Sequence, residues 1–299
     1  MPEWESEIVV GEDLARRLIA ARFPALDVSS LRPIGEGWDN TVWATADDVA
    51  FRFPRRQIAV PGVERELTLL PGLAAQLPAP IPDAAFAGAR SAEFPWPWFG
   101  SRLIDGTEVA AAGLGVGERG GLAADLGRFL GRLHGLRPDI APELPIDPMG
   151  RADMGVRVPR AREALERVAS AWAGGAEAET VLSAAQELAR DGEAVVVHGD
   201  LHLRHALVSD GGGLAGVIDW GDVCRAPRSV DLSLYWSLFD PGERFAFREA
   251  YGPLSDATLA RARVLALYFG GTLAAYALDV GMDALAREAL DGLDRTLVD

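Results

Sequence analysis

The sequence predicts an α+β protein of two lobes, a small β-rich N-terminal lobe followed by a larger, mainly helical C-terminal lobe. Two observations lead to this prediction. Short apolar and β-branched runs separated by turn residues fill the first part of the chain, as in a series of strands. Apolar residues then recur at spacings of three and four, as on the buried faces of helices. We expect the lobes to be residues 1–103 and 104–299.

The composition sets limits on the function. With 299 residues, 49% of them hydrophobic, the chain can bury a large core. A formal charge of −15 disfavours nucleic acid as a partner and would attract a cationic small molecule. No apolar stretch approaches the roughly 20 residues that span a bilayer, and the acidic start is unlike a signal peptide. The lone Cys224 fits a reducing compartment. We expect a cytoplasmic monomer with no membrane partner.

The first lobe begins with an amphipathic segment at residues 14–23, and three strands follow at residues 31–34, 41–45 and 49–53. Gly35 and Gly37 lie in the loop that joins the first two strands, where glycines let the backbone approach phosphates closely. Strand leads to strand here, whereas a dinucleotide fingerprint would lead into a helix. Two glycines in a turn are also common without any ligand.

The chain contains no lysine, so all 29 of its basic residues are arginine. Any phosphate-binding cation must therefore be an arginine, and Arg52 lies in the middle of the third strand between apolar neighbours. A helix at residues 63–76 follows and carries Glu64 and Glu66 in its first turn. A strand at residues 100–104 then leads into the second lobe.

The second lobe is predicted to be a helical scaffold. Apolar residues at helical spacing place the first of its helices at residues 118–134, where His134 is expected to be structural. Further helices are expected at residues 161–172, 177–190, 229–238, 244–251, 256–278 and 283–297. Residues 147–158 are the least regular and are a candidate cap over the site.

The segment VVVHGDLHLRHALVSDGGGLAGVIDW, residues 195–220, carries the candidate chemistry. A β-branched strand at residues 195–197 ends just before Asp200. His205 precedes a second apolar stretch, and three glycines then turn the chain back in a predicted hairpin that ends at Asp219. The two carboxylates are thus expected to face one pocket, with His205 between them.

This combination suits phosphoryl transfer to a hydroxyl group. One acid would orient the hydroxyl and accept its proton, while the other acid and the imidazole would hold Mg²⁺ against nucleoside triphosphate phosphates. The alternative is a simple turn at residues 198–200 with an exposed acid at Asp219.

The motifs HGDLHLRH and GVIDWGD resemble those of the aminoglycoside and macrolide phosphotransferases, a family built like protein kinases, and the resemblance extends over nearly the whole chain. It implies a bilobal protein-kinase-like fold with Asp200 as the catalytic base and Asp219 as a metal ligand. His205 departs from the asparagine that most of the family places there. At this position the chain is similar to the macrolide kinases and the 2''-directed aminoglycoside kinases, which also have histidine there and often prefer GTP. His205 can bind the metal or merely support its ligands.

The resemblance also assigns roles to residues outside this segment. It implies that Arg52 contacts the nucleotide phosphates together with the Gly35–Gly37 loop, and that Glu66 pairs with Arg52. Ser101 and Leu103 would lie against the purine at the hinge between the lobes. The remaining histidines of the motif, His198 and His202, are expected to brace the loop, and Asp231 is expected to brace it from below.

We therefore expect an enzyme that transfers the γ-phosphoryl group of ATP or GTP, with Mg²⁺, to a hydroxyl of an antibiotic and so confers resistance. The acidic charge favours a cationic aminoglycoside over a macrolide. Acceptor contacts are predicted at Tyr235, Trp236, Asp240 and Asp279. A housekeeping kinase for an amino alcohol or sugar would keep the same catalytic residues. The missing lysine and the missing asparagine leave a nucleotide-binding pseudoenzyme as the alternative outside catalysis.

Overall fold

The computed structural model describes residues 6–36, 39–115, 117–137, 141, 143–188 and 192–299. The chain divides into two compact units. The N-terminal unit comprises Met1–Gln76 and Pro80–Asp105, and the C-terminal unit comprises Leu77–Ala79 and Gly106–Asp299. The boundary at Asp105 falls two residues beyond the one expected at Leu103.

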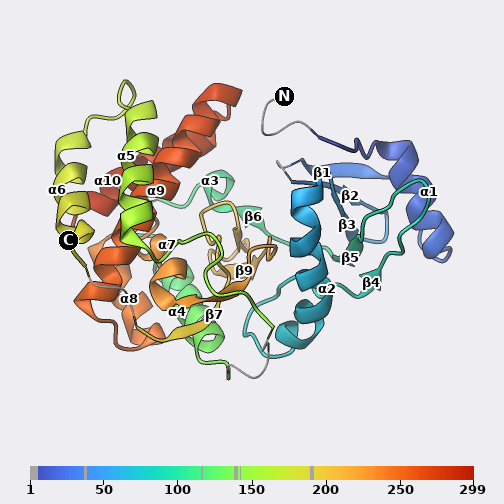
Figure 1. Cartoon of the computed structure of the whole chain (residues 1–299), viewed down its shortest axis with the longest axis horizontal. Helices are drawn as coiled ribbons and strands as arrows, with labels where there is room; N and C mark the ends of the chain where they lie inside the picture. The colour runs from blue at the N-terminus through green and yellow to red at the C-terminus, as the bar shows by residue number, and fades with distance from the viewer. Residues whose placement is uncertain (1–5, 37–38, 116, 138–140, 142, 189–191) are drawn as a thin grey trace. The chain divides into compact units, whose positions relative to one another are not determined.

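The N-terminal unit is a five-stranded antiparallel sheet in the order β1-β2-β3-β5-β4 with two helices (Figure 1). Its elements are α1 (Glu12–Arg22), β1 (Arg32–Glu36), β2 (Asn40–Ala44), β3 (Val49–Pro54), a 3₁₀ turn (Gln57–Ala59), α2 (Val60–Ala74), β4 (Phe86–Ala87) and β5 (Phe99–Arg102). A turn that includes residues 47–48 joins β2 to β3, and Asp48 adopts a positive φ of 53° there.

The side chains of β3 alternate between two environments, as the two-residue period of a strand requires. Phe51 and Phe53 are fully buried and pack with Phe94 and Trp98 in an aromatic core, where the Phe53 and Trp98 ring centroids lie 5.0 Å apart. Arg52 lies between them in sequence and projects from the opposite face, only half-buried. The sheet thus presents a charged side chain on the face away from its aromatic core.

The C-terminal unit is mainly helical. Its helices are α3 (Val109–Ala112), α4 (Gly120–His134), α5 (Met154–Arg167), α6 (Gly175–Gln186), a 3₁₀ turn (Arg228–Asp231), α7 (Ser233–Ser237), α8 (Pro241–Tyr251), α9 (Asp256–Val280) and α10 (Asp283–Leu297). The long helix α9 packs against α5, α7 and α10, and α4 packs against α8. These helices surround the segments that carry the motifs.

Two small sheets hold the motif segments in place. Strand β7 (Ala194–Val197) pairs with β10 (Cys224–Pro227), and β6 (Thr107–Glu108), β8 (Ala206–Val208) and β9 (Leu214–Val217) form a three-stranded sheet. The antiparallel pairing of β8 with β9 confirms the predicted hairpin. The strands β4, β6 and β10 and the helix α3 lack an obvious sequence pattern and were not predicted.

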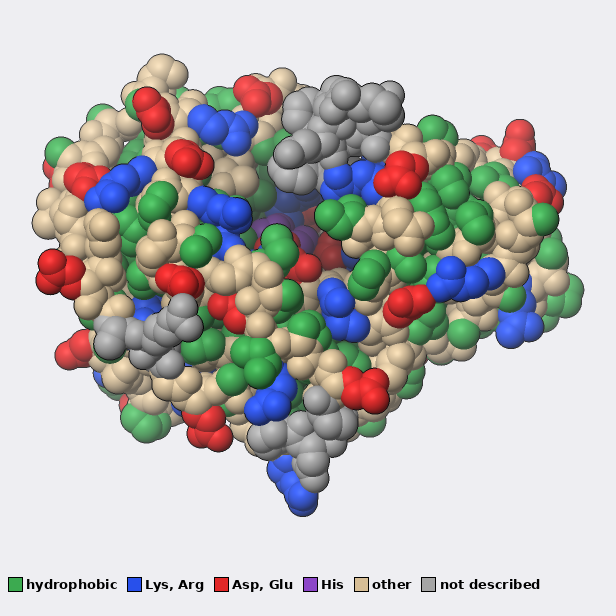
Figure 2. Space-filling view, in the orientation of Figure 1, with side chains coloured by type: hydrophobic (Ala, Val, Ile, Leu, Met, Phe, Trp, Pro, Cys, Tyr) green, Lys and Arg blue, Asp and Glu red, His purple; other side chains and the backbone are tan. Residues whose placement is uncertain are grey.

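No described helix is long and apolar enough to cross a membrane. On the face drawn in Figure 2, arginine and carboxylate side chains are interspersed over each unit. The net negative charge is therefore not gathered into a single acidic patch on that face.

Candidate active site

The loop after β7 brings Asp200 to the surface of the C-terminal unit. The chain turns at Gly199, whose φ is +90° and where a Cβ atom would lie only 2.3 Å from the carbonyl oxygen of Asp222. Only glycine avoids this clash and tolerates this backbone conformation. The Asp200 side chain, 28% exposed, follows directly.

Asp231 braces this loop, as the resemblance implied. Its carboxylate is fully buried and accepts hydrogen bonds from the backbone N–H groups of His198 (2.7 Å) and Gly199 (2.9 Å). A further contact of 3.1 Å joins it to Nε2 of His134, which is structural, as expected. Burial alone would raise the pKa of Asp231, but His134 and the backbone donors outweigh it and lower that pKa.

His198 has a defined tautomer. Its Nε2 lies 2.9 Å from the carbonyl oxygen of Ile218, which can only accept, so Nε2 carries the proton. Its Nδ1 accepts the backbone N–H of Asp200 at 3.2 Å. Burial lowers the pKa of His198. His198 is therefore a neutral brace within the loop, in agreement with its expected role.

This buried histidine predicts a loss of stability on mild acidification. The unfolded chain takes up a proton below about pH 6.5, whereas the folded protein resists protonation of His198. Native protein thus binds fewer protons, so the free energy of unfolding should fall as pH drops below 6.5, by up to about 1 kcal/mol near pH 5.5. Urea unfolding at pH 7.5 and 5.5 measures this loss.

The control is His198→Gln, which keeps an N–H donor for the Ile218 carbonyl but does not titrate. It should lose less stability between the two pH values than the wild type. His202 contributes with the same sign, since burial and then the neighbouring His205 lower its pKa well below the ordinary value. An unchanged pH dependence in the variant would exclude His198 as a source of the effect.

His205 joins the two candidate carboxylate residues. Its Nδ1 lies 2.9 Å from the Asp200 carbonyl oxygen and must donate to it, which leaves the Nε2 lone pair available. Nε2 in turn lies 3.6 Å from Oδ2 of Asp219. Asp219 adopts a positive φ of 65°, a conformation that is uncommon outside glycine and often found at functional sites. The structure therefore brings Asp200, His205 and Asp219 together.

Two sets of side chains are candidates for holding a divalent metal. His205 and Asp219 form the expected pair, and a metal-binding histidine commonly donates its other N–H to a carbonyl, as His205 does. Asp200, His202 and His205 form a second group, with ligand atoms all within 4.8 Å of one another. However, Nδ1 of His202 faces the Arg204 backbone N–H at 3.4 Å, so its Nε2 presents a proton toward Asp200 and not a lone pair. This tautomer favours the expected pair.

Arg151 contacts the candidate base and was not predicted as a site residue. Its Nη2 lies 3.0 Å from Oδ1 of Asp200 and 2.6 Å from Oδ2 of Asp222. Burial alone would lower the pKa of this guanidinium, but the two carboxylates outweigh it and raise that pKa, so Arg151 is a fixed positive charge. It comes from residues 147–158, which were expected only to cap the site.

In the N-terminal unit, Arg52 and Glu66 form the expected pair. Nη1 of Arg52 lies 3.2 Å from Oε1 of Glu66, whose carboxylate is fully buried in α2. With its amide oxygen turned toward Arg52, Asn40 also accepts from Nε (3.1 Å) and Nη2 (2.7 Å). Asn40 is the first residue of β2 and was not predicted as a site residue. These two partners fix the orientation of the guanidinium.

The other predicted nucleotide contacts are placed differently. Gly35 lies in β1 at an irregularity of its pairing with β2, and Gly37 falls outside the described residues. Ser101 is buried, and its hydroxyl accepts the Ala84 backbone N–H at 2.9 Å. The N–H of Leu103 donates to the Asp48 carbonyl at 2.8 Å, so only the Leu103 carbonyl remains to meet a base. These four contacts stay predictions.

Three of the four predicted acceptor residues have structural roles in the C-terminal unit, and the fourth, Asp279, is exposed. Tyr235 and Trp236 are buried in α7, where the Trp236 ring donates to the Leu259 carbonyl. Asp240 caps α8 in a reciprocal capping box with Glu243. Asp279 is exposed and lies 3.7 Å from Arg167. Their contact with an acceptor stays a prediction, and these roles give it no support.

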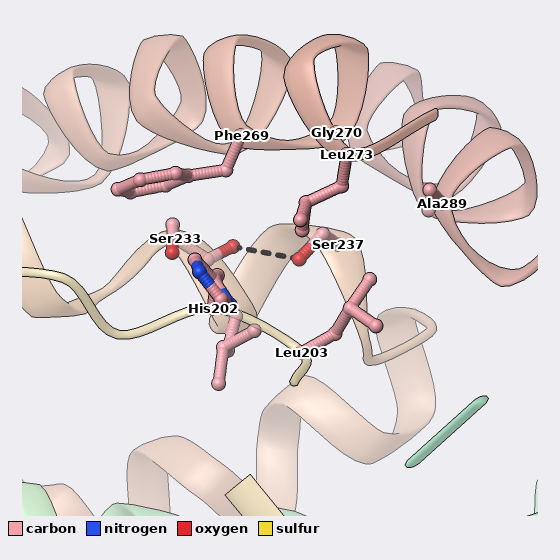
Figure 3. Close-up of a pocket in the computed structure, with 10 residues that line it drawn as sticks. His202, Leu203, Ser233, Ser237, Phe269, Gly270, Leu273 and Ala289 are labelled. Atoms are coloured by element: carbon pink, nitrogen blue, oxygen red, sulfur yellow. Dashed lines mark hydrogen bonds between the residues drawn. The ribbon is translucent and has the colours of Figure 1, made fainter. Parts of the chain in front are cut away.

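A small cavity lies beside the loop that carries Asp200 and is lined in part by His202 and Leu203 of that loop. Figure 3 shows His202, Ser233, Ser237 and Phe269 among the residues around it. Its volume is about 10 Å³, room for about one water molecule. The cavity is too small for an antibiotic. The rings of His202 and Phe269 pack edge-on beside it, with centroids 5.7 Å apart, so the cavity belongs to the packing between the loop and α9.

The fold and this site define a kinase-like phosphotransferase, and comparison with known proteins agrees. Residues 30–265 match the model of the phosphotransferase enzyme family. The chain belongs to that family. No curated protein sequence matches it significantly.

Solved structures show the same fold at low sequence identity. The chain is similar to the GDP complex of wild-type aminoglycoside 2'-phosphotransferase-IIIa, at 19% identity and a TM-score of 0.69, covering 96% of this chain and 99% of that one. It is also similar to macrolide 2'-phosphotransferase MphH from Brachybacterium faecium, at 22% identity and a TM-score of 0.61, covering 94% and 97%. These likenesses confirm the kinase-like α+β fold.

Proposed function

We propose that the enzyme transfers the γ-phosphoryl group of ATP or GTP to a hydroxyl group of an antibiotic, an aminoglycoside or a macrolide, and thereby confers resistance. The arrangement of His205 carries the proposal, because this one imidazole contacts the Asp200 backbone at 2.9 Å and lies 3.6 Å from the Asp219 carboxylate. The residues proposed as proton acceptor and metal ligand therefore share His205 as a neighbour.

Each group then has a role in the transfer. Asp200 accepts the proton of the acceptor hydroxyl, as a general base must lie within hydrogen-bond reach of its proton. Arg52, held by Glu66 and Asn40, contacts the nucleotide phosphates through its planar set of donors. Mg²⁺ held by Asp219 and His205 would neutralise phosphate charge when bound. Catalysis rests on positioning and charge neutralisation.

Both antibiotic classes occur among the similar structures. Aminoglycoside complexes were solved with GDP and kanamycin and with streptomycin and ATP, and two other structures are macrolide 2'-phosphotransferases. The excess of 44 acidic over 29 basic residues favours a cationic aminoglycoside as acceptor. Burial raises the pKa of the lone thiol, Cys224, to about 12, so it takes no part in the chemistry. We propose that the enzyme acts as a cytoplasmic monomer.

The deciding experiment measures nucleoside diphosphate release with ATP and GTP in parallel. Aminoglycosides, macrolides and small amino alcohols serve as acceptors, and Asp200→Asn is the blank. We expect release that depends on one class of antibiotic. Release only with an amino alcohol would instead indicate a metabolite kinase, and nucleotide binding without release for any acceptor would contradict the proposal.

A further inference from the structure

Arg151 is the buried cation closest to the candidate base in the C-terminal unit. Its side chain is only 9% exposed, and its Nη2 is shared between Oδ1 of Asp200 at 3.0 Å and Oδ2 of Asp222 at 2.6 Å. Charge-assisted hydrogen bonds of this length are strong and directional. A guanidinium this buried needs both carboxylates to offset its lost hydration.

The segment that presents Arg151 is built to hold it still. Both carboxylate oxygens of Asp147 accept backbone N–H groups, from Arg151 at 2.7 Å and Ala152 at 2.9 Å. The backbone of Asp147 donates to the Arg225 carbonyl in β10, the strand that pairs with β7. The buried Arg157 donates to the carbonyl oxygens of Met149 and Gly150. The same small sheet thus anchors both Arg151 and the loop of Asp200.

This contact makes the two oxygens of Asp200 unequal. Oδ1 is occupied by Arg151, whereas among the described residues no hydrogen bond reaches Oδ2. Nε2 of His202 lies 3.7 Å from Oδ2, beyond hydrogen-bond distance. Rotation of the carboxylate would break the bond to Arg151. Oδ2 is therefore the oxygen that remains available to a substrate hydroxyl.

We propose that Arg151 is a positioning residue for phosphoryl transfer, which holds Oδ1 of Asp200 so that Oδ2 alone meets the acceptor hydroxyl. The inference rests on the proposed function. In the step, the acceptor O–H bond breaks and its proton passes to Oδ2, while the acceptor oxygen bonds to the γ-phosphorus. The bond from that phosphorus to the β–γ bridging oxygen breaks, and the nucleoside diphosphate leaves.

The test compares Arg151→Ala with wild type in acceptor-dependent turnover. Misplacement of a catalytic group by about 1 Å can cost about 100-fold, so kcat should fall by about 10- to 100-fold while KM for nucleotide and acceptor changes little. Guanidinium chloride should restore part of kcat in this variant, because it refills the site between the two carboxylates. Arg151→Lys should retain an intermediate kcat, since an ammonium keeps the charge but not the planar donors.

Two further variants separate positioning from folding. Arg162→Ala removes an exposed arginine that pairs with Glu179 on α5 and α6, and it should keep its activity and show no response to guanidinium. Asp222→Asn should lower kcat less than Arg151→Ala does. The double variant, Arg151→Ala with Asp222→Asn, should be no slower than Arg151→Ala alone, because both substitutions disrupt the same contact. Melting temperatures for each variant report any loss of fold.

If the wild-type enzyme turns over and the Arg151→Ala variant is equally active, or is impaired only in KM, the positioning role is overturned and the proposed function stands. The positioning role would also be overturned if kcat falls, guanidinium does not restore it, and the melting temperature of the variant is lowered as well. A wild-type protein inactive with every acceptor would remove the proposed function and this role together. If Arg151→Ala does not fold, Arg151→Lys and Asp222→Asn carry the test.

Discussion

Asp200→Asn is expected to lower kcat by about 10²- to 10⁴-fold, the usual contribution of a general base, while nucleotide affinity stays unchanged. The amide has nearly the same shape as the carboxylate, and its oxygen can still accept from Arg151 at the position of Oδ1. It cannot take up the proton of the acceptor hydroxyl. Acceptor-dependent diphosphate release measures the loss, and isothermal titration with the nucleotide checks that binding survives.

The matched control is Asp222→Asn, which removes the same charge from the other partner of Arg151. Asp222 does not take the proton, so this variant should be much less impaired than Asp200→Asn. If both variants lost kcat equally, the site would need only a negative charge beside Arg151 and not a proton acceptor at Asp200. Near-normal turnover in Asp200→Asn would exclude Asp200 as the base.

The centre of the site could be predicted because it is local in sequence. A β-branched run, a loop and a hairpin place Asp200, His205 and Asp219 within twenty residues. Strand β7 begins one residue before its expected start, and β8 and β9 form the predicted hairpin. The period of a strand and the turning capacity of consecutive glycines depend only on neighbouring residues. Local rules were therefore sufficient for the strands and the hairpin of this segment.

Contacts across long sequence separations could not be predicted in this way. Arg151 is 49 residues from Asp200 and lies in the stretch with the weakest periodicity. The start of α5 was missed for a related reason. Pro159 lies inside the helix, although proline is typical of a first turn, and Asp153 caps the helix at its true start by accepting the Gly155 N–H. Hydrogen bonds from Arg157 to the carbonyl oxygens of Met149 and Gly150 support the additional turns at the start of the helix.

The acceptor predictions at α7 and α8 show the limits of residue type as evidence. Aromatic side chains can line a pocket or fill a core, and only their partners distinguish the two. Here Trp236 lies between two arginines, Arg244 and Arg263, whose guanidinium carbons are each 4.5 Å from its ring centroid. Asp240 could have been recognised as a cap, because Glu243 three residues later completes a capping box.

Asp231→Ala is expected to lower the free energy of unfolding by about 3–5 kcal/mol, because each buried donor left without its acceptor costs about 1–3 kcal/mol. The substitution leaves the backbone N–H groups of His198 and Gly199 buried without their acceptor and removes the partner of His134. Urea unfolding at neutral pH measures the loss. Asp231→Asn should lose less, because an amide oxygen can still accept one of the two backbone bonds.

Asp279→Ala is the control for the loss of a carboxylate elsewhere in the same unit. Its side chain is 72% exposed and lies 3.7 Å from Arg167, so its removal should change stability by less than about 1 kcal/mol. If Asp231→Ala were equally mild, the loop would not depend on the buried carboxylate. A large loss in Asp231→Ala alone would show that the stability of the fold around the Asp200 loop depends on a buried carboxylate more than thirty residues away, which does not contact the base directly.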